Sequence, residues 1–131
     1  MIHGKVNSGL EPRISVAVHD ASGGRQFIEA TLDTGFNGYM TLPGNALLSL
    51  GLTKSGSTRI ILGDGRVEKC SVSRAIVDWD GIPPDIEIEA ADFKPLVGTR
   101  LMRGFHLHIQ VEADGDVIIV PLNATTATPR P

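Results

Sequence analysis

The sequence has little cysteine and few aromatic residues, and each scarcity excludes a kind of protein. Of its 131 residues one is cysteine, and only 5% are Phe, Trp or Tyr. A single cysteine can form neither an internal disulfide nor a thiolate metal cluster. No histidine stands near Cys70 in the sequence, so we expect a half-buried core residue rather than a catalytic thiol. A reducing, cytoplasmic compartment fits this cysteine usage best.

The sequence also lacks a strong charge imbalance and a long apolar run. Its 12 Lys and Arg residues against 15 Asp and Glu residues give a formal net charge of −3. The basic residues are scattered singly, which argues against a nucleic-acid partner. No apolar run approaches the ~20 residues of a membrane-spanning helix. Residues 1–5 lack the apolar stretch of a signal peptide, so we expect no membrane partner.

Short alternating segments separated by turn residues fill most of the sequence, which predicts an all-β domain. Residues 13–19 and 26–32 alternate apolar and polar side chains and should form a hairpin. Further strands are expected at residues 39–42, 58–62, 66–79, 85–90, 105–111 and 117–122. One domain should span residues 1–122, and the Thr-, Ala- and Pro-rich residues 123–131 should form a flexible tail.

Two short helices should interrupt the strands. Residues 45–50 are followed by Gly51, a typical helix C-cap. Residues 99–103 should form one or two turns, with Thr99 as the N-cap. A small barrel is the usual way for many short antiparallel strands to hide their edges.

The motif Asp33-Thr34-Gly35 stands directly after one of the predicted strands. A strand that ends in a carboxylate holds the acid on a rigid support. Gly35 can take backbone angles closed to other residues, and the Thr34 hydroxyl can donate and accept a hydrogen bond. Such a tripeptide is also found in ordinary Asp-Gly turns, so the surrounding sequence has to decide its role.

The surrounding sequence resembles the retropepsins, the proteases of retroviruses and their cellular relatives. Residues 28–35 resemble the active-site strand and loop of this family. Leu96-Val97-Gly98, followed by residues 99–102, resembles the family's segment of two apolar residues and Gly with its helix, which crosses behind the catalytic loop. The likeness covers roughly residues 13–122.

Within that clan the sequence is most similar to a group of small bacterial and archaeal proteins. These proteins carry Asp-Thr-Gly-Phe with Gly two positions further on, then Leu-Pro, as in residues 33–38 and 42–43 here. They also carry a Leu-x-Asp-Gly reversal, matched by residues 62–65. Phe36 departs from the viral enzymes, which have Ala or Ser there, and Asp64 adds a charge to a flap tip that is richer in Gly in the viral enzymes.

The resemblance implies a fold, an assembly and a set of site residues. The fold would be a retropepsin-like closed β-barrel with one or two short helices, assembled as a homodimer that cleaves peptides or proteins without metal or cofactor. The catalytic residues would be Asp33, Thr34 and Gly35. The substrate-binding residues would be Phe36, Asn37 and the flap tip Gly63, Asp64 and Gly65.

The chemistry itself requires two carboxylates. One must be ionised to accept a proton from water, while the other, protonated, donates a hydrogen bond to the scissile carbonyl. Like charges a few ångströms apart cannot both ionise cheaply, and aspartic proteases are the standard example. The sequence contains one Asp-Thr-Gly, so the second Asp33 has to come from a two-fold-related copy.

Other interpretations compete with a protease. His106 and His108 could be metal ligands, but their alternation favours a polar strand face. Asp114-Gly115-Asp116 lacks the later ligands of a calcium loop and is better explained as a hairpin turn. Trp79 should anchor the core or an interface. The alternative functions are a dimeric peptide-binding or assembly module without turnover and a small β-barrel ligand binder with a structural Asp33.

Overall fold

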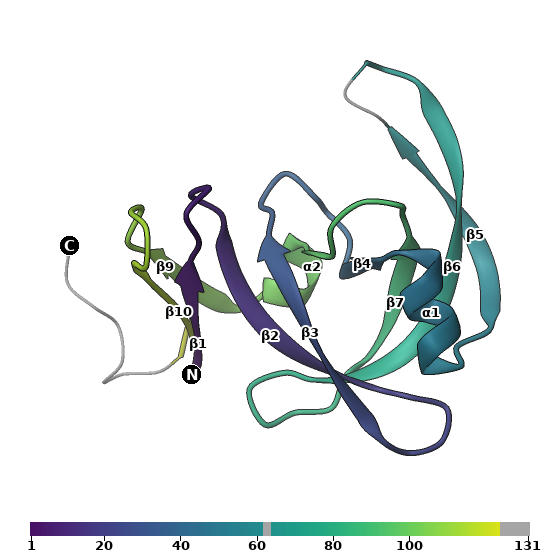
Figure 1. Cartoon of the computed structure of the whole chain (residues 1–131), viewed down its shortest axis with the longest axis horizontal. Coiled ribbons are helices and arrows are strands. Elements are labelled where there is room, and N and C mark those ends of the chain that lie inside the picture. The colour runs from purple at the N-terminus through teal and green to yellow at the C-terminus, as the bar shows by residue number, and fades with distance from the viewer. Residues whose placement is uncertain (62–63, 124–131) are drawn as a thin grey trace.

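The computed structural model describes residues 1–61 and 64–123, and most of them lie in strands (Figure 1). The strands are β1 (Ile2–Val6), β2 (Pro12–His19), β3 (Arg25–Leu32), β4 (Met40–Leu42), β5 (Lys54–Ile61), β6 (Val67–Asp78), β7 (Asp85–Ala90), β8 (Leu96–Val97), β9 (Phe105–Ile109) and β10 (Asp116–Pro121). The helices are α1 (Gly44–Leu50) and α2 (Thr99–Met102). The predicted tail lies outside the described residues, apart from Asn123.

The strands form one sheet that bends back on itself. Its order is β5-β6-β7-β4-β8-β3-β2-β1-β10-β9, and β6 pairs in addition with β2. That extra contact is short and joins Ala17 to Asp78 and Val18 to Val77. It brings together two strands that stand five places apart in the sheet order. Strands β5 and β9 form the two ends of that order, and full closure into a barrel stays a prediction.

The predicted hairpin of residues 13–19 and 26–32 is confirmed as β2 and β3. The two strands are paired from Arg13 opposite Thr31 to His19 opposite Arg25. Strand β1 was not predicted, although its alternating exposure fits a strand, and it pairs with both β10 and β2. Strand β5 begins at Lys54, before the predicted residue 58, because pairing with β6 extends the strand through a polar segment.

The helices agree with prediction except at one cap. Gly51 ends α1 in the left-handed conformation with φ of 71°, as expected of a C-cap glycine. Thr99 is not the N-cap of α2: Gly98 holds that position, and no side chain caps the helix. The Thr99 hydroxyl instead donates to the carbonyl of Phe36 at 3.3 Å. No helix of the described residues is long and apolar enough to span a membrane.

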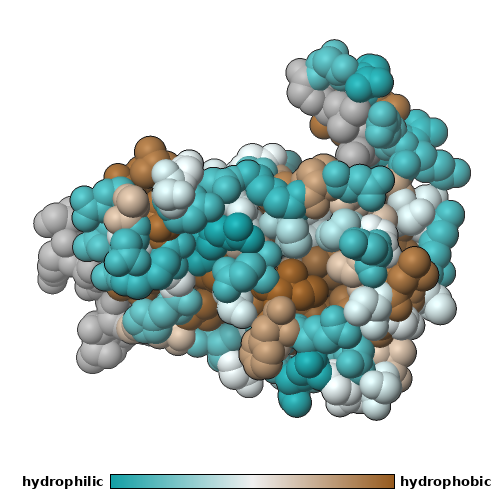
Figure 2. Space-filling view, viewed as in Figure 1, coloured by the Kyte–Doolittle hydropathy of each residue, from teal (hydrophilic) through white to brown (hydrophobic). Residues whose placement is uncertain are grey.

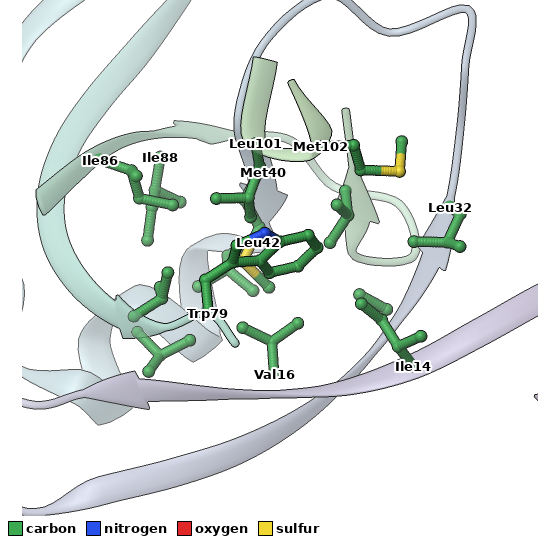
Figure 3. Packing of buried hydrophobic residues seen from close by; sticks show 14 of the residues in the cluster. Ile14, Val16, Leu32, Met40, Leu42, Trp79, Ile86, Ile88, Leu101 and Met102 are labelled. Carbon is green, nitrogen blue, oxygen red and sulfur yellow. The ribbon is translucent and has the colours of Figure 1, made fainter. Parts of the chain in front are cut away.

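The core lies inside the bend of the sheet (Figure 3). Side chains from β2, β3, β4, β7 and α2 point toward a common centre, including Ile14, Val16, Leu32, Met40, Leu42, Ile86, Ile88, Leu101 and Met102. Trp79 is buried among them, as predicted, with its ring edge-on to Phe105 at a centroid distance of 6.0 Å. Residues 33–39 connect β3 to β4 and are called the Asp33 loop. All three residues of β4 are buried, so the strand that follows this loop is fixed inside the core.

The hairpin of β5 and β6 extends away from this body (Figures 1 and 2). Strand β6 is 12 residues long, and its two halves have different surroundings. Near the body, Ala75 and Val77 are buried in the core, whereas residues 67–69 are exposed. The outer part of this hairpin is therefore supported mainly by its own strand pairing.

A pair of leucines tests the position of the core. Leu42 on β4 is fully buried, whereas Leu48 on α1 is 81% exposed. We expect Leu42→Ala to lower the free energy of unfolding by about 2–5 kcal/mol, because it removes buried methyl groups and leaves a cavity. Leu48→Ala should change that free energy by less than about 0.5 kcal/mol. Urea unfolding at one fixed protein concentration measures both, and equal effects would contradict this core.

Candidate active site

Asp33 follows β3 directly and is oriented by a short turn. Its backbone N–H donates to the carbonyl of Val97 at 2.9 Å, which ties it to β8. Its carboxylate Oδ1 accepts the N–H of Gly35 at 2.8 Å. The side chain is half-buried. The strand therefore holds this carboxylate at one place, and its Oδ2 makes no hydrogen bond to the residues that the structure describes.

Strand β8 passes between the two strands that carry the Asp33 loop. It runs parallel to β3, with Thr31 opposite Leu96, and antiparallel to β4, with Met40 opposite Val97. The chain therefore enters the loop on one side of β8 and leaves it on the other. The predicted crossing of Leu96-Val97-Gly98 behind the loop is confirmed.

Gly98 is the point of closest approach in this crossing. Its N–H donates to the carbonyl of Tyr39 at 2.9 Å. A Cβ atom placed on it would lie 2.2 Å from the carbonyl oxygen of Gly38 and 2.6 Å from that of Phe36. No side chain fits at such distances, so the position requires glycine.

The first turn of α2 binds the same loop. The N–H of Thr99 donates to the carbonyl of Phe36 at 2.9 Å, and the N–H of Arg100 donates to that of Gly38 at 3.2 Å. The N-terminal N–H groups of a helix have no partners within the helix. Here the loop carbonyls supply two of those partners, so α2 and the Asp33 loop stabilise each other.

The ring of Phe36 packs on two glycines. A Cβ on Gly38 would lie 2.5 Å from its Cζ, and a Cβ on Gly98 would lie 2.7 Å from its Cδ2. The missing side chains of these glycines therefore make room for the bulky ring at position 36. The Phe-x-Gly spacing was visible in the sequence, but its contact with Gly98 was not. Contact between Phe36 and a substrate stays a prediction.

The other residues of the loop face outward. Thr34, Gly35 and Asn37 are exposed. The Asn37 carbonyl accepts a hydrogen bond from Arg100 Nε at 3.3 Å. The Thr34 hydroxyl makes no hydrogen bond to the part of the chain that the structure describes. The structure thus leaves this hydroxyl available beside Asp33.

The predicted flap tip is described only in part. Gly63 lies outside the described residues, and Gly65 has a φ of 86°, which glycine adopts freely. The carboxylate of Asp64 accepts a hydrogen bond from the Arg66 backbone N–H at 3.0 Å and pairs with Arg66 Nε at 2.6 Å. The charge that Asp64 brings to the tip is therefore neutralised locally. Substrate contacts at Asp64 and Gly65 stay predictions.

A polar cavity of about 550 Å³ lies beside the Asp33 loop. Asn37, Gly38 and Tyr39 form one wall, and β5, β6, β7 and α2 provide charged side chains. Glu89 stands out among them, because its Oε2 is buried without a hydrogen-bond partner among the described residues. Burial, and then the nearby charge of Glu87, raises the pKa of Glu89 above its usual value. Sequence reasoning missed Glu89, although the alternation of residues 85–90 marked it as facing away from the core.

The other candidate residues do not gather into a second centre. His106 and His108 are neighbours on β9 with ring centroids 5.9 Å apart. Within residues 1–61 and 64–123, no group of three or more His, Cys, Asp or Glu side chains is placed to hold a metal ion. Cys70 is buried, its Sγ lies 3.1 Å from the carbonyl of Ala90, and burial raises its thiol pKa. An activated thiol has the opposite shift.

Comparison with known proteins gives evidence at the level of fold. No family model matches the sequence, and no curated protein matches it. A solved structure does: the crystal structure of a retropepsin-like aspartic protease from Rickettsia conorii is similar, with a TM-score of 0.55. The two sequences are 16% identical, and the match covers 88% of this chain and 87% of that chain. The chain therefore has a retropepsin-like fold, with the Asp33 loop and its crossing as described above.

The glycine at the crossing offers a direct test. Gly98→Ala should lower the free energy of unfolding by about 1–3 kcal/mol or more, because its Cβ would overlap two backbone carbonyls that have little room to move. Gly44→Ala is the matched control, since a Cβ there meets nothing within 4 Å. Gly44 begins α1, where Ala should be neutral or slightly stabilising. Thermal unfolding compares the variants, and an unaffected Gly98→Ala would contradict the close approach.

Proposed function

We propose that the protein is an aspartic endopeptidase that works as a homodimer, with one Asp33 from each chain forming the catalytic pair. The observation that carries this proposal is the position of Asp33. The carboxylate stands at the end of β3, on a loop held from behind by β8 and α2, in a retropepsin-like fold. The Asp-Thr-Gly motif is intact at that place.

The reaction would be a direct attack of water on a peptide bond. One Asp33 carboxylate, ionised, takes a proton from the water, while the other, protonated, donates a hydrogen bond to the scissile carbonyl. The tetrahedral intermediate then collapses, the C–N bond breaks, and the leaving nitrogen takes a proton from the pair. The pair begins and ends the cycle with one shared proton, and water supplies the OH and H of the two products.

The homodimer follows from this chemistry, and several features support it. Each chain provides one Asp33, while Thr34 is exposed beside it with its hydroxyl unpaired in the described chain. In the proposed dimer, Thr34 of each chain would bind the loop of the other. The β2–β6 contact supports the closed barrel that belongs to this proposal, because it completes a cycle of pairings through β6, β7, β4, β8, β3 and β2. The ends of the sheet at β5 and β9 offer edges that a second copy could cover.

The substrate would be an extended segment of peptide or protein. An extended peptide adds to a protein as a further strand, with backbone hydrogen bonds for affinity and alternate side chains in pockets for specificity. The projecting hairpin of β5 and β6 is suited to cover such a segment, in the manner of a flap. The ring of Phe36 packs on Gly38 and Gly98. This packing favours an open cleft over the alternative of a peptide-binding module whose cleft is filled by Phe36.

Replacing the catalytic group tests the proposal. Asp33→Asn preserves the shape of the side chain, but its amide cannot accept the proton from water. We therefore expect cleavage of a mixed peptide library to fall at least about a hundredfold, with fold and dimer intact. Mass spectrometry from acidic to neutral pH measures cleavage, and the parent should show a bell-shaped pH profile that belongs to the pair.

Asp114→Asn is the matched control for this test. Asp114 lies in the turn before β10 with a φ of 64°, a conformation that Asn also tolerates, and it does not line the cavity beside the Asp33 loop. This variant should cleave like the parent. Equal cleavage by Asp33→Asn would remove Asp33 from the mechanism. A parent that cuts no peptide at any pH would leave a binding module as the better explanation.

The assembly can be tested without any substrate. Light scattering at micromolar concentration should give a particle of twice the 13.9 kDa chain mass. Thr34→Val keeps the size of the side chain and removes the hydroxyl, so it should weaken dimerisation by at least about tenfold. Thr53→Val, at an exposed position before β5, should leave dimerisation unchanged. A parent that remains a 13.9 kDa monomer would contradict both the dimer and the shared pair.

A further inference from the structure

The cavity beside the Asp33 loop contains a carboxylate, that of Glu89, which forms no ion pair within residues 1–61 and 64–123. Strand β7 has two faces, and its core face carries Ile86 and Ile88, which are 1% and 0% exposed. Alternation along the strand therefore turns Glu87 and Glu89 to the opposite face, where both line the cavity. One strand thus supplies both the core and the acidic wall of the cavity.

The register of the sheet explains why the two glutamates differ. Arg74 on β6 stands directly opposite Glu87, and its guanidinium lies 3.9 Å from that carboxylate. Glu89 stands opposite Val72 on β6 and opposite Thr41 on β4. Neither of these neighbours carries a charge, so the sheet gives Glu89 no cross-strand partner.

None of the three arginines that line the cavity pairs with Glu89 in the part of the chain that the structure describes. Arg74 is further engaged by Asp85, whose carboxylate lies 3.3 Å from its Nε. Arg100 donates to the Asn37 carbonyl, and its guanidinium carbon lies 6.0 Å from the centre of the Tyr39 ring. Arg59, on the projecting hairpin, forms no ion pair with Glu89 in the described part of the chain.

The Glu89 carboxylate lies against the loop that begins at Asp33. A Cβ on Gly38 would be 3.1 Å from Glu89 Oε2, so the absence of a side chain there admits the carboxylate. That oxygen is buried and has no hydrogen-bond partner in the described chain, while the side chain as a whole remains partly exposed and lines the cavity. A partly desolvated carboxylate gains most from a cationic partner that arrives with the ligand.

We propose that Glu89 is a specificity-determining residue and that this cavity receives a Lys or Arg side chain of the peptide substrate. The inference rests on the proposed peptidase function, and it names the class of substrate. A volume of about 550 Å³ is in the range of small-molecule pockets and holds one long side chain with water. The Tyr39 ring offers an apolar surface for the aliphatic stem of that side chain.

A peptide fits this site better than a free small cation. The cavity wall includes Asn37 and Gly38, which belong to the loop that carries Asp33. A strand bound along that loop would place every second side chain on the same side. One such side chain would enter the cavity while the peptide backbone runs past the catalytic group.

The test compares peptides that differ in one charge. A cleaved sequence is first found in a mixed library, and each position within four residues of the cut is then made Lys or norleucine, which matches most of the lysine chain without its charge. At one position the parent should cleave the Lys peptide at least about tenfold more efficiently by kcat/KM. Glu89→Gln should reduce that ratio to less than about twofold, and Glu89→Lys should favour a Glu peptide instead.

The pH dependence of this ratio gives an independent readout. Titration of the Asp33 pair affects both peptides equally, so it cancels in the ratio. The preference needs ionised Glu89, so it should be lost at acidic pH and appear as the pH rises through the raised pKa of Glu89. The titratable and charged groups that surround Glu89 are Asp85 and Glu87 on β7, Arg74 and Cys70 on β6, Arg59 on β5, Arg100 on α2 and Tyr39 just before β4.

Glu87→Gln is the matched control, because it removes a charge from the same strand and the same wall. Arg74 already pairs with Glu87, so this variant should retain the Lys preference. It should also shift the preference to lower pH, because the charge of Glu87 helps to raise the pKa of Glu89. A general effect of lost negative charge would instead reduce the preference in both variants alike.

The outcomes separate this inference from the proposed function. Cleavage without any Lys or Arg preference, or a preference that survives in Glu89→Gln, would overturn the inference and leave the peptidase standing. If the parent cleaves nothing, fluorescence anisotropy measures the binding to Asp33→Asn of two labelled mixed peptide libraries, which carry Lys or norleucine at one fixed position. A Lys preference that depends on Glu89 would then support the inference without turnover. Equal binding, or none, would overturn it.

Discussion

The rest of the site depends on the close approach of Gly98 to the backbone of the Asp33 loop. At this point two segments 63 positions apart in the sequence meet through Thr99 and Phe36. Because Gly98 has no side chain, β8 can lie between β3 and β4, and α2 can begin where its N–H groups reach the loop carbonyls. The loop is thereby held in place by β8 and α2 on one side, and its outer face is not needed for this support. A carboxylate on that face is oriented before any ligand arrives.

The same constraint explains the bulky residue after Asp-Thr-Gly. The ring of Phe36 would overlap a Cβ atom on Gly38 or on Gly98. With glycine at both places the ring fills the space between the loop and the crossing and adds apolar contact there. Phe36, Gly38 and Gly98 therefore form one packing unit. A change at one of them has to be matched at the others.

Sequence reasoning predicted what is encoded locally. The β2–β3 hairpin and the end of α1 at Gly51 each have a strong local pattern, whereas the glycine crossing was expected from the resemblance to the retropepsins. Strand β1 was missed because Gly4 interrupts its alternation of apolar and polar side chains. Glycine is required at that position because a Cβ atom there would overlap the backbone carbonyl of Arg13. The alternation of residues 85–90 shows in the sequence that Glu89 faces away from the core. That no cation pairs with it among the described residues could not be predicted, because a shift of the β6–β7 register would change the residue opposite Glu89, and the register depends on the whole sheet.

In the proposed dimer, the cavity would occur twice, and this has a consequence for the substrate. Two-fold symmetry would place one Glu89 on each side of the shared Asp33 pair, at equal distances along the cleft. A peptide has a direction, so the two cavities would meet positions on opposite sides of the scissile bond that are not equivalent in backbone geometry. A single Lys side chain would then bind in the cavity that the direction of the peptide backbone allows. The other cavity would hold a second side chain or water. The presence of one cavity in each subunit would therefore not define a single cleavage position relative to the basic residue. The geometry of the site would fix the number of residues between a basic residue and the scissile bond. The direction of the peptide backbone would decide whether the basic residue lies before or after that bond.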